Sequence, residues 1–89
     1  MRRTEREAIF QSRFLEDLLY WTKTDRKTAV RVLELVHAVL QDPFVGIGKP
    51  ELLRFGLAGF WSRRITQEHR LVYEVSETQI RFHQARYHY

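Results

Sequence analysis

The spacing of apolar residues changes along this 89-residue chain at a loop over residues 44–51, which contains two glycines and a proline. Before the loop, apolar residues recur every three to four positions, which is the period of an amphipathic helix. After it, apolar and polar residues alternate, which is the period of a strand with one buried face. Helices followed by a run of strands are typical of an α+β fold.

Two helices are predicted before this loop. Ser12 is a good N-cap residue for the first, because its hydroxyl can accept a hydrogen bond from a free N–H group of the first turn. Thr24 or Asp25 can cap the second, and Asp42-Pro43 ends it, since the residue before a proline disfavours a helix. The expected apolar face of the first helix consists of Phe14, Leu15, Leu18, Leu19 and Trp21. That of the second consists of Ala29, Val32, Leu33, Val36, Val39 and Leu40. The short connection between them predicts an antiparallel hairpin.

Five strands are predicted, one before the helices and four after the loop. They are expected at residues 8–11, 52–55, 60–65, 69–75 and 79–87. Because the turns between the last four are short, we expect antiparallel strands. The predicted order is β-α-α-β-β-β-β, an antiparallel sheet with one face packed on the helical hairpin and the other face available to a ligand. One domain is expected over residues 1–89, with residues 1–7 an extension that is either disordered or caps the first strand.

Composition excludes several classes of protein. Cysteine is absent, which excludes a disulfide framework, a thiolate metal site and a cysteine nucleophile. The longest apolar runs, such as Leu18–Trp21, are far shorter than the roughly 20 residues of a membrane span. Charged residues follow Met1 where a signal peptide needs an apolar stretch. We therefore expect a soluble cytoplasmic protein without a membrane partner.

The chain is basic and rich in arginine. Its net charge is +4, its pI is about 9.9, and 12 of its 15 basic residues are arginine. From Pro43 onward there are seven basic residues against four acidic ones. Because arginine binds phosphate through a planar fork, this distribution predicts a polyanionic partner. Any single arginine, taken alone, is more simply explained as solvated surface.

The second half of the chain contains the groups that cut RNA without a metal. Such a reaction needs a base for the ribose 2′-OH, a cation for the charge on the phosphate and an acid for the leaving 5′-oxygen. Glu51, Arg70 and His88 are of these types. An exposed glutamate or a histidine near a chain end is more often plain surface, and His69 on an alternating strand fits a core histidine. On chemistry alone the prediction is a basic α+β domain that binds RNA.

One long motif is more specific. The run from Trp61 to Tyr73, WSRRITQEHRLVY, resembles the signature of the Txe/YoeB family of toxins, within the RelE superfamily. The matches cover the chain from about Phe14 to its end, in the order in which the family has them. Phe55 departs from the family, which often has histidine there, so we expect no role for it. The other matching segments are Tyr20-Trp21, Asp42-Pro43-Phe44, Gly48-Lys49-Pro50-Glu51, Gly59-Phe60 and Ala85-Arg86-Tyr87-His88-Tyr89.

The resemblance implies a ribosome-dependent endoribonuclease, which cuts messenger RNA in the ribosomal A site by 2′-OH attack and uses neither a metal nor a cofactor. It implies that Glu51 is the general base and that Arg70 stabilises the phosphate in the transition state. His88 would be the general acid, and Tyr89 would help to position the substrate. The residues expected to bind substrate are Lys49, Arg54 and Arg64.

The resemblance also implies partners. These are an antitoxin of the YefM/Phd type, the ribosome with its messenger RNA, and operator DNA only as a complex with the antitoxin. A homodimer stays open. The alternative to the enzyme is a non-catalytic basic module that binds RNA or protein and acts as a subunit of the antitoxin–operator complex.

Overall fold

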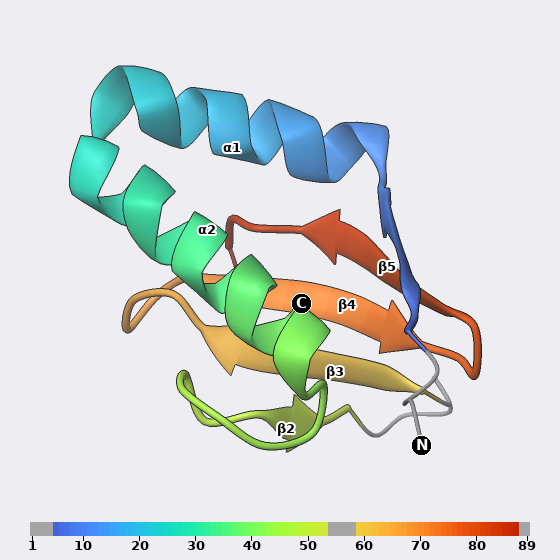
Figure 1. The fold of residues 1–89 in the computed structure, drawn as a ribbon. Helices are drawn as coiled ribbons and strands as arrows, with labels where there is room; N and C mark the ends of the chain where they lie inside the picture. Colours follow the sequence, from blue (N-terminus) through green and yellow to red (C-terminus); the bar gives the residue numbers. More distant parts are fainter. Residues whose placement is uncertain (1–4, 54–58, 88–89) are drawn as a thin grey trace.

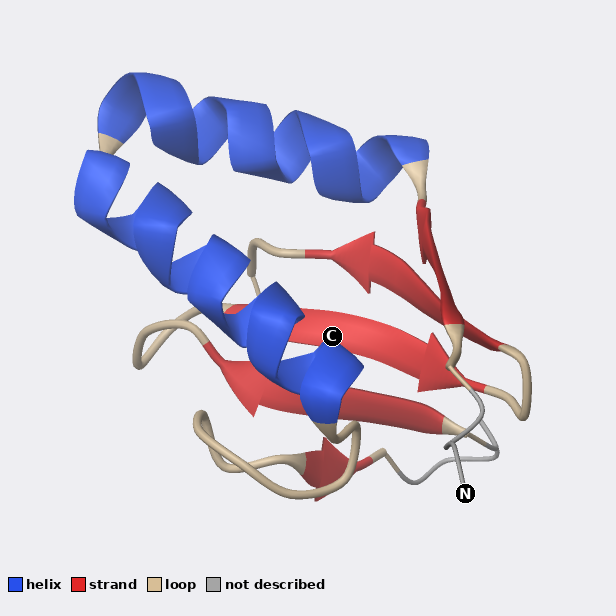
Figure 2. Cartoon of the chain, viewed as in Figure 1, coloured by secondary structure: helices blue, strands red, loops and turns tan. Residues whose placement is uncertain are grey.

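The computed structural model describes residues 5–53 and 59–87, and this part of the chain forms two helices and five strands. The strands form one sheet, and both helices lie against the same face of it (Figure 1 and Figure 2). The α+β fold and the predicted order of elements are therefore confirmed. In chain order the elements are β1 (Glu7–Phe10), α1 (Ser12–Thr24), α2 (Arg26–Gln41), β2 (Glu51–Leu52), β3 (Phe60–Arg64), β4 (Arg70–Val75) and β5 (Gln79–Gln84).

The sheet is mixed rather than wholly antiparallel. Its strand order is β1-β5-β4-β3-β2, and the four strands after the helices pair antiparallel, as their short turns require. The first strand runs parallel to β5, with Glu7 opposite Gln79. A tight turn fixes the direction only of the strands that it joins, and both helices follow β1 before the next strand. The prediction of antiparallel pairing is therefore wrong for β1 alone.

The segment before β1 contacts the turn between β4 and β5. Glu7 belongs to β1, and its N–H group donates to the carbonyl of Thr78 at 2.9 Å. The side chain of Arg6 donates from Nε to the carbonyl of Ser76 at 2.8 Å. The described part of the predicted extension therefore packs on the sheet, and residues 1–4 lie outside the described residues.

The two helices begin in different ways. Ser12 is the first residue of α1 rather than its cap, and the cap residue Gln11 makes no side-chain hydrogen bond. The prediction that Ser12 caps this helix is therefore wrong. Asp25 caps α2 as predicted, since its carboxylate accepts from the N–H of Thr28 at 3.2 Å and from the hydroxyl of the same residue at 2.9 Å. Within the described residues, neither helix has the length and apolar character that a membrane span requires.

The core lies between the helices and the sheet, and on each helix it uses only part of the predicted apolar face. Phe14 and Trp21 of α1 are buried as expected. Leu15, Leu19, Leu33 and Leu40 were expected in the core and are 41–54% exposed, so that prediction is wrong. The buried residues of α2 are Thr28, Ala29, Val32, Leu35, Val36 and Val39. Each helix thus rests on one narrow stripe and leaves leucines on its outer surface.

Arg63 is fully buried between the sheet and the loop that follows α2. Its Nε donates to the hydroxyl of Tyr73 at 3.1 Å, and that hydroxyl donates to the carbonyl of Pro43 at 2.7 Å. Burial raises the pKa of the Tyr73 hydroxyl, and the guanidinium beside it opposes that rise. The side chain of Arg63 also donates to the main-chain carbonyls of Asp42 at 2.6 Å, Ile47 at 3.2 Å and Val45 at 3.3 Å. The loop is therefore held by one side chain that satisfies its carbonyl groups.

Gly48 joins this loop to the sheet. Its carbonyl accepts from the N–H of Arg64 at 2.6 Å, just before the chain enters β2. Its φ is +84°, and a Cβ atom there would lie 2.8 Å from Cδ2 of Leu35. Only glycine combines this backbone conformation with so close an approach. The loop is thereby fixed at both ends, which sets the position of β2 and of Glu51 at its start.

Candidate active site

The register of the sheet brings three of the predicted site residues to one face. Glu51 lies opposite Ser62, and Arg64 lies opposite Arg70. Residues opposite one another in antiparallel strands point to the same side, and so do residues two apart in one strand. Glu51, Arg64 and Arg70 therefore share the face that points away from the helices, while Arg63 points toward the loop. This open face is the candidate active site.

Glu51 of β2 and Arg70 of β4 form an ion pair across β3, the strand that lies between them. The distance from Nη1 of the arginine to Oε1 of the glutamate is 3.4 Å. The side chain of Arg70 is 12% exposed and that of Glu51 is 63% exposed. The cation is thus held in the protein, while solvent and substrate can reach the carboxylate. A long pair with one exposed partner contributes little stability, so a ligand can separate the two groups at low cost.

Two polar side-chain atoms on this face are buried without a hydrogen-bond partner among the described residues. They are Nε of Arg70 and Oγ of Ser62. A buried polar atom without a partner costs about 1–3 kcal/mol, and native proteins seldom retain one without a reason. Ser62 lies opposite Glu51 in the sheet, and the side chain of Arg70 contacts Glu51 from the next strand but one. The open face thus keeps at least one unused donor, the N–H of the Arg70 side chain, next to its carboxylate.

Two further cationic residues lie close to the pair in the chain or in the sheet, Lys49 two residues before Glu51 and Arg64 opposite Arg70. Arg64 at the end of β3 is exposed, and so is Lys49, which has a φ of +52° just before β2. Among the described residues no carboxylate forms an ion pair with either of them. Their charges are therefore available to an anion. Arg54, His88 and Tyr89, which were also predicted to belong to the site, lie outside the described residues.

The segment after β5 is held on α1. The carboxylate of Asp17 accepts from the N–H of Ala85 at 2.9 Å, and the indole N–H of Trp21 donates to the carbonyl of Ala85 at 2.8 Å. The guanidinium of Arg86 lies 3.4 Å from the centre of the Tyr20 ring and 4.6 Å from that of Tyr87. Three consecutive residues, 85–87, are thus fixed directly before His88 in the sequence.

Sequence reasoning missed Asp17 and the structural role of Arg63. Asp17 is only 5% exposed and lies between Phe14 and Trp21 on the buried stripe of α1. A carboxylate on an otherwise apolar helix face is a signal that could have indicated a buried partner. Its carboxylate pairs locally with Arg13, one turn earlier, at 3.2 Å. It also accepts from a main-chain N–H 68 residues away, and no local pattern reveals that second partner.

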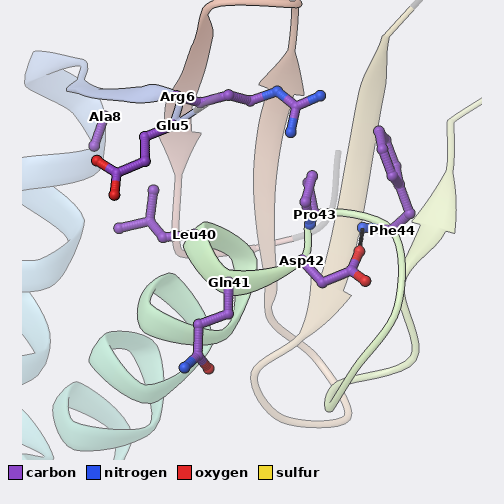
Figure 3. A pocket seen from close by; sticks show the side chains of 8 residues that line it. All are labelled: Glu5, Arg6, Ala8, Leu40, Gln41, Asp42, Pro43 and Phe44. Carbon is purple, nitrogen blue, oxygen red and sulfur yellow. Dashed lines mark hydrogen bonds between the residues drawn. The ribbon is translucent and has the colours of Figure 1, made fainter. Parts of the chain in front are cut away.

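A hollow elsewhere on the molecule contains none of the predicted site residues. It has a volume of about 590 Å³ and lies between the start of β1 and the end of α2 (Figure 3). Its lining includes Arg6, Gln41 and Phe44. Nε of Arg6 is already bonded to a carbonyl, so the side chain lacks the unused Nε donor that Arg70 has on the open face. The open face is therefore the better candidate for chemistry on an anionic substrate.

Comparisons with known proteins place this small α+β protein, with its cationic site on an open sheet face, in a family. The model of the YoeB-like toxin of bacterial type II toxin–antitoxin systems matches residues 10–89. Toxin RelK of Mycobacterium tuberculosis is 49% identical over 84 residues, which are 94% of this chain and 99% of the relative. The chain belongs to this family of YoeB-like toxins, and the resemblance seen in its motifs is confirmed.

Two solved structures share both fold and sequence. The YoeB dimer from Staphylococcus aureus superposes with a TM-score of 0.85 at 37% identity, covering 96% of this chain and 99% of that one. The YoeB–YefM complex from the same species gives 0.81 at 36% identity, covering 94% and 98%.

Proposed function

We propose that this toxin is an endoribonuclease that cuts messenger RNA in the ribosomal A site and so stops translation. The observation that carries the proposal is the open sheet face, where Glu51 lies 3.4 Å from Arg70 and exposed cations flank the pair. A carboxylate base beside a fixed guanidinium is the arrangement that attack by a ribose 2′-OH on the adjacent phosphate requires.

The proposed step needs three groups. Glu51 takes the proton of the 2′-OH, and the 2′-oxygen then forms a bond to the neighbouring phosphorus. Arg70 stabilises the charge that builds on the non-bridging oxygens. His88 donates a proton to the 5′-oxygen as its bond to phosphorus breaks, which leaves a 2′,3′-cyclic phosphate and a free 5′-OH. The first two roles are supported by the geometry of the open face, and the third rests on the family resemblance, as does the positioning role of Tyr89.

The unused donor of Arg70 supports its role. Its Nε is buried without a partner among the described residues, while Nη1 contacts Glu51 at 3.4 Å. A phosphate oxygen would satisfy this donor and would compete with the glutamate for the guanidinium. Binding of substrate would therefore free the carboxylate to act as a base at the same time as it engages the cation. Lys49 and Arg64 would bind neighbouring phosphates, and we propose the same for Arg54.

We further propose that the ribosome presents the substrate. An isolated domain of this size offers little surface with which to choose an RNA sequence, and its charge of +4 suits a polyanionic surface of ribosomal RNA. On this proposal the ribosome supplies the geometry of the messenger, and the toxin supplies the groups that react.

An antitoxin of the YefM/Phd type is the proposed protein partner, because a relative of 36% identity is found in a YoeB–YefM complex. The leucines on the outer surfaces of α1 and α2 offer apolar area for such a partner. Binding of operator DNA would then be a property of the complex. A homodimer is proposed in the same way, from the YoeB dimer of Staphylococcus aureus.

Mapping of messenger 5′ ends in a purified translation system, with and without ribosomes, tests the function. Wild type should give ribosome-dependent cuts at A-site codons. Arg70→Ala and His88→Ala should each slow cutting by about 100-fold or more, which is the usual cost of losing a transition-state contact. His37→Asn, on the exposed surface of α2, is the control. Protection of RNA without new ends would instead support the non-catalytic binding module.

A further inference from the structure

We propose that His69 is a positioning residue, which holds Tyr87 and thereby fixes the backbone directly before His88 in the sequence. The inference rests on the proposed function in one respect, the role of His88 as general acid. Its structural part rests on contacts within the described residues alone.

Tyr87 is held from both sides by two consecutive residues. Its N–H group donates to Nδ1 of His69 at 2.7 Å, and its carbonyl accepts from the N–H of Arg70 at 3.1 Å. The φ of Tyr87 is +67°, a left-handed conformation that residues with a side chain seldom adopt. Such a conformation persists only where surrounding contacts impose it. Here those contacts are the two bonds to His69 and Arg70.

The ring of His69 is itself fixed. It packs edge-on against Trp21, with ring centres 4.8 Å apart and planes at 79°. The main-chain N–H of His69 donates to the hydroxyl of Thr66 at 3.2 Å, and its carbonyl accepts from the N–H of Ile65 at 2.9 Å. Trp21 also donates to the carbonyl of Ala85 at 2.8 Å. One indole ring thus supports both the histidine and the segment that the histidine holds.

The bond to Tyr87 defines the chemical state of the imidazole. A main-chain N–H can only donate, so Nδ1 of His69 must be the unprotonated nitrogen of a neutral ring that carries its proton on Nε2. A simple space-filling histidine would have no such requirement. We therefore assign to His69 the role of a hydrogen-bond acceptor at Nδ1, and not that of a bulky ring that fills space.

The position of this contact links it to the reaction. His69 is adjacent to Arg70, whose guanidinium contacts Glu51 at 3.4 Å. His88 follows Tyr87 directly in the sequence. The dipeptide 69–70 therefore connects the proposed base, the phosphate-binding cation and the segment that carries the proposed acid. A general acid must be placed to a fraction of an ångström, and a displacement of 1 Å can cost about 100-fold in rate.

Three variants of His69 distinguish a role as a hydrogen-bond acceptor from a role that only fills space. His69→Leu removes the acceptor, and His69→Gln places its polar atoms nearer to where Nε2 lies. His69→Asn can present an oxygen close to the place of Nδ1. We expect Leu and Gln to lower kcat for ribosome-dependent cutting by about 100-fold with KM nearly unchanged, because RNA binding is intact while the acid is displaced. Asn should restore kcat to within about tenfold of wild type. His37→Asn is the control for the loss of a histidine elsewhere.

Nuclear magnetic resonance on the full chain without RNA gives a measurement that is independent of cutting. A long-range proton–nitrogen correlation should show Nδ1 of His69 unprotonated in wild type. Exchange of the Tyr87 amide with solvent should be faster in His69→Leu than in wild type and restored in His69→Asn. The tautomer is measured on the wild-type protein alone, so this measurement can be made even if His69→Leu does not fold.

The outcomes are distinct. The positioning role would be overturned if His69→Leu and His69→Gln cut as fast as wild type. It would also be overturned if kcat of His69→Asn were as low as that of His69→Leu. A protonated Nδ1 would overturn the contact itself. If wild type does not cut at all, the proposed function fails, and the tautomer together with the exchange of the Tyr87 amide still decides whether His69 holds the segment.

Discussion

Arg63 and Arg64 are neighbours in the sequence with opposite surroundings. Arg63 is fully buried and satisfies three carbonyl groups of the loop after α2, whereas Arg64 is exposed on the open face. Strand alternation predicts that the two point to opposite sides. It does not predict which side is buried, because the carbonyl partners of Arg63 lie 16 to 21 residues earlier and are main-chain groups without a sequence signature.

Arg63→Ala should therefore destabilise the protein strongly. It leaves several buried carbonyls and the Tyr73 hydroxyl with fewer partners and opens a cavity, so we expect a loss of about 3 kcal/mol or more in the free energy of unfolding. Urea unfolding followed by circular dichroism measures it. Arg64→Ala, the matched control, should change stability by less than about 0.5 kcal/mol. Equal effects of the two substitutions would show that the buried guanidinium does not hold the loop.

Arg70 should behave in the reverse way. Its Nε is buried without a partner among the residues that the structure describes, so we expect the side chain to contribute little to folding and to have a donor available for a ligand. Arg70→Met is expected to leave the free energy of unfolding within about 1 kcal/mol of wild type, or to raise it. The same substitution should lower the rate of cutting by about 100-fold or more. Unfolding and single-turnover cutting measured on one preparation would check both, and a large loss of stability would contradict the first.

At the scale of elements, the sequence predicted which segments form helices and strands but not how the helices lie on the sheet. The stripe that a helix buries depends on the angle at which it crosses its neighbours. The apolar residues of α2 are spread so widely around the helix that several different stripes could be buried. Leu33 and Leu40 were assigned to the core for this reason, and Leu35 was not. The placement of Glu51, Arg64 and Arg70 on one face followed from strand register, which the turns largely set.

Gly48 tests the link between the loop and β2. Gly48→Ala forces a side chain into a φ of +84° and into contact with Leu35, so we expect a loss of about 1–3 kcal/mol in stability. Cutting should fall as well, because the position of Glu51 depends on this residue. Lys49→Gly is the matched control for stability, since it replaces the neighbouring residue, which has a left-handed φ, by a glycine that adopts this conformation without strain. It should change the free energy of unfolding by less than about 1 kcal/mol. A neutral Gly48→Ala would mean that the loop can shift without consequence.

At the scale of the whole molecule, the two layers present different surfaces. The sheet layer exposes cations around Glu51, and the helix layer exposes Leu15 and Leu19 one turn apart on α1. The proposed reaction uses the first surface, which leaves the second for protein partners. A partner bound to the helix surface would therefore leave the sheet surface free, and the reverse also holds.

Substitution of both leucines by glutamate should therefore separate the two properties. Because Leu15 and Leu19 are 52% and 54% exposed, we expect little change in stability. Affinity for the proposed YefM/Phd-type antitoxin should fall by about tenfold or more, as buried apolar area is lost from the interface. Cutting of messenger RNA should persist. Calorimetric titration of the antitoxin measures the first effect, with Lys27→Glu on α2 as a charge-matched control, and unchanged affinity would place the antitoxin elsewhere.

The strand order has a consequence for how the protein is made. The last of the described elements in the chain, β5, lies inside the sheet, between β1 and β4. During synthesis β1 has no strand to pair with until residues 79–82 have been added, so the sheet closes through a contact between distant parts of the chain. Residues 85–87 join α1 only after that. A chain synthesised only as far as β5 thus lacks the segment held beside Arg70, and the proposed reactive groups can come together only after that segment has been added.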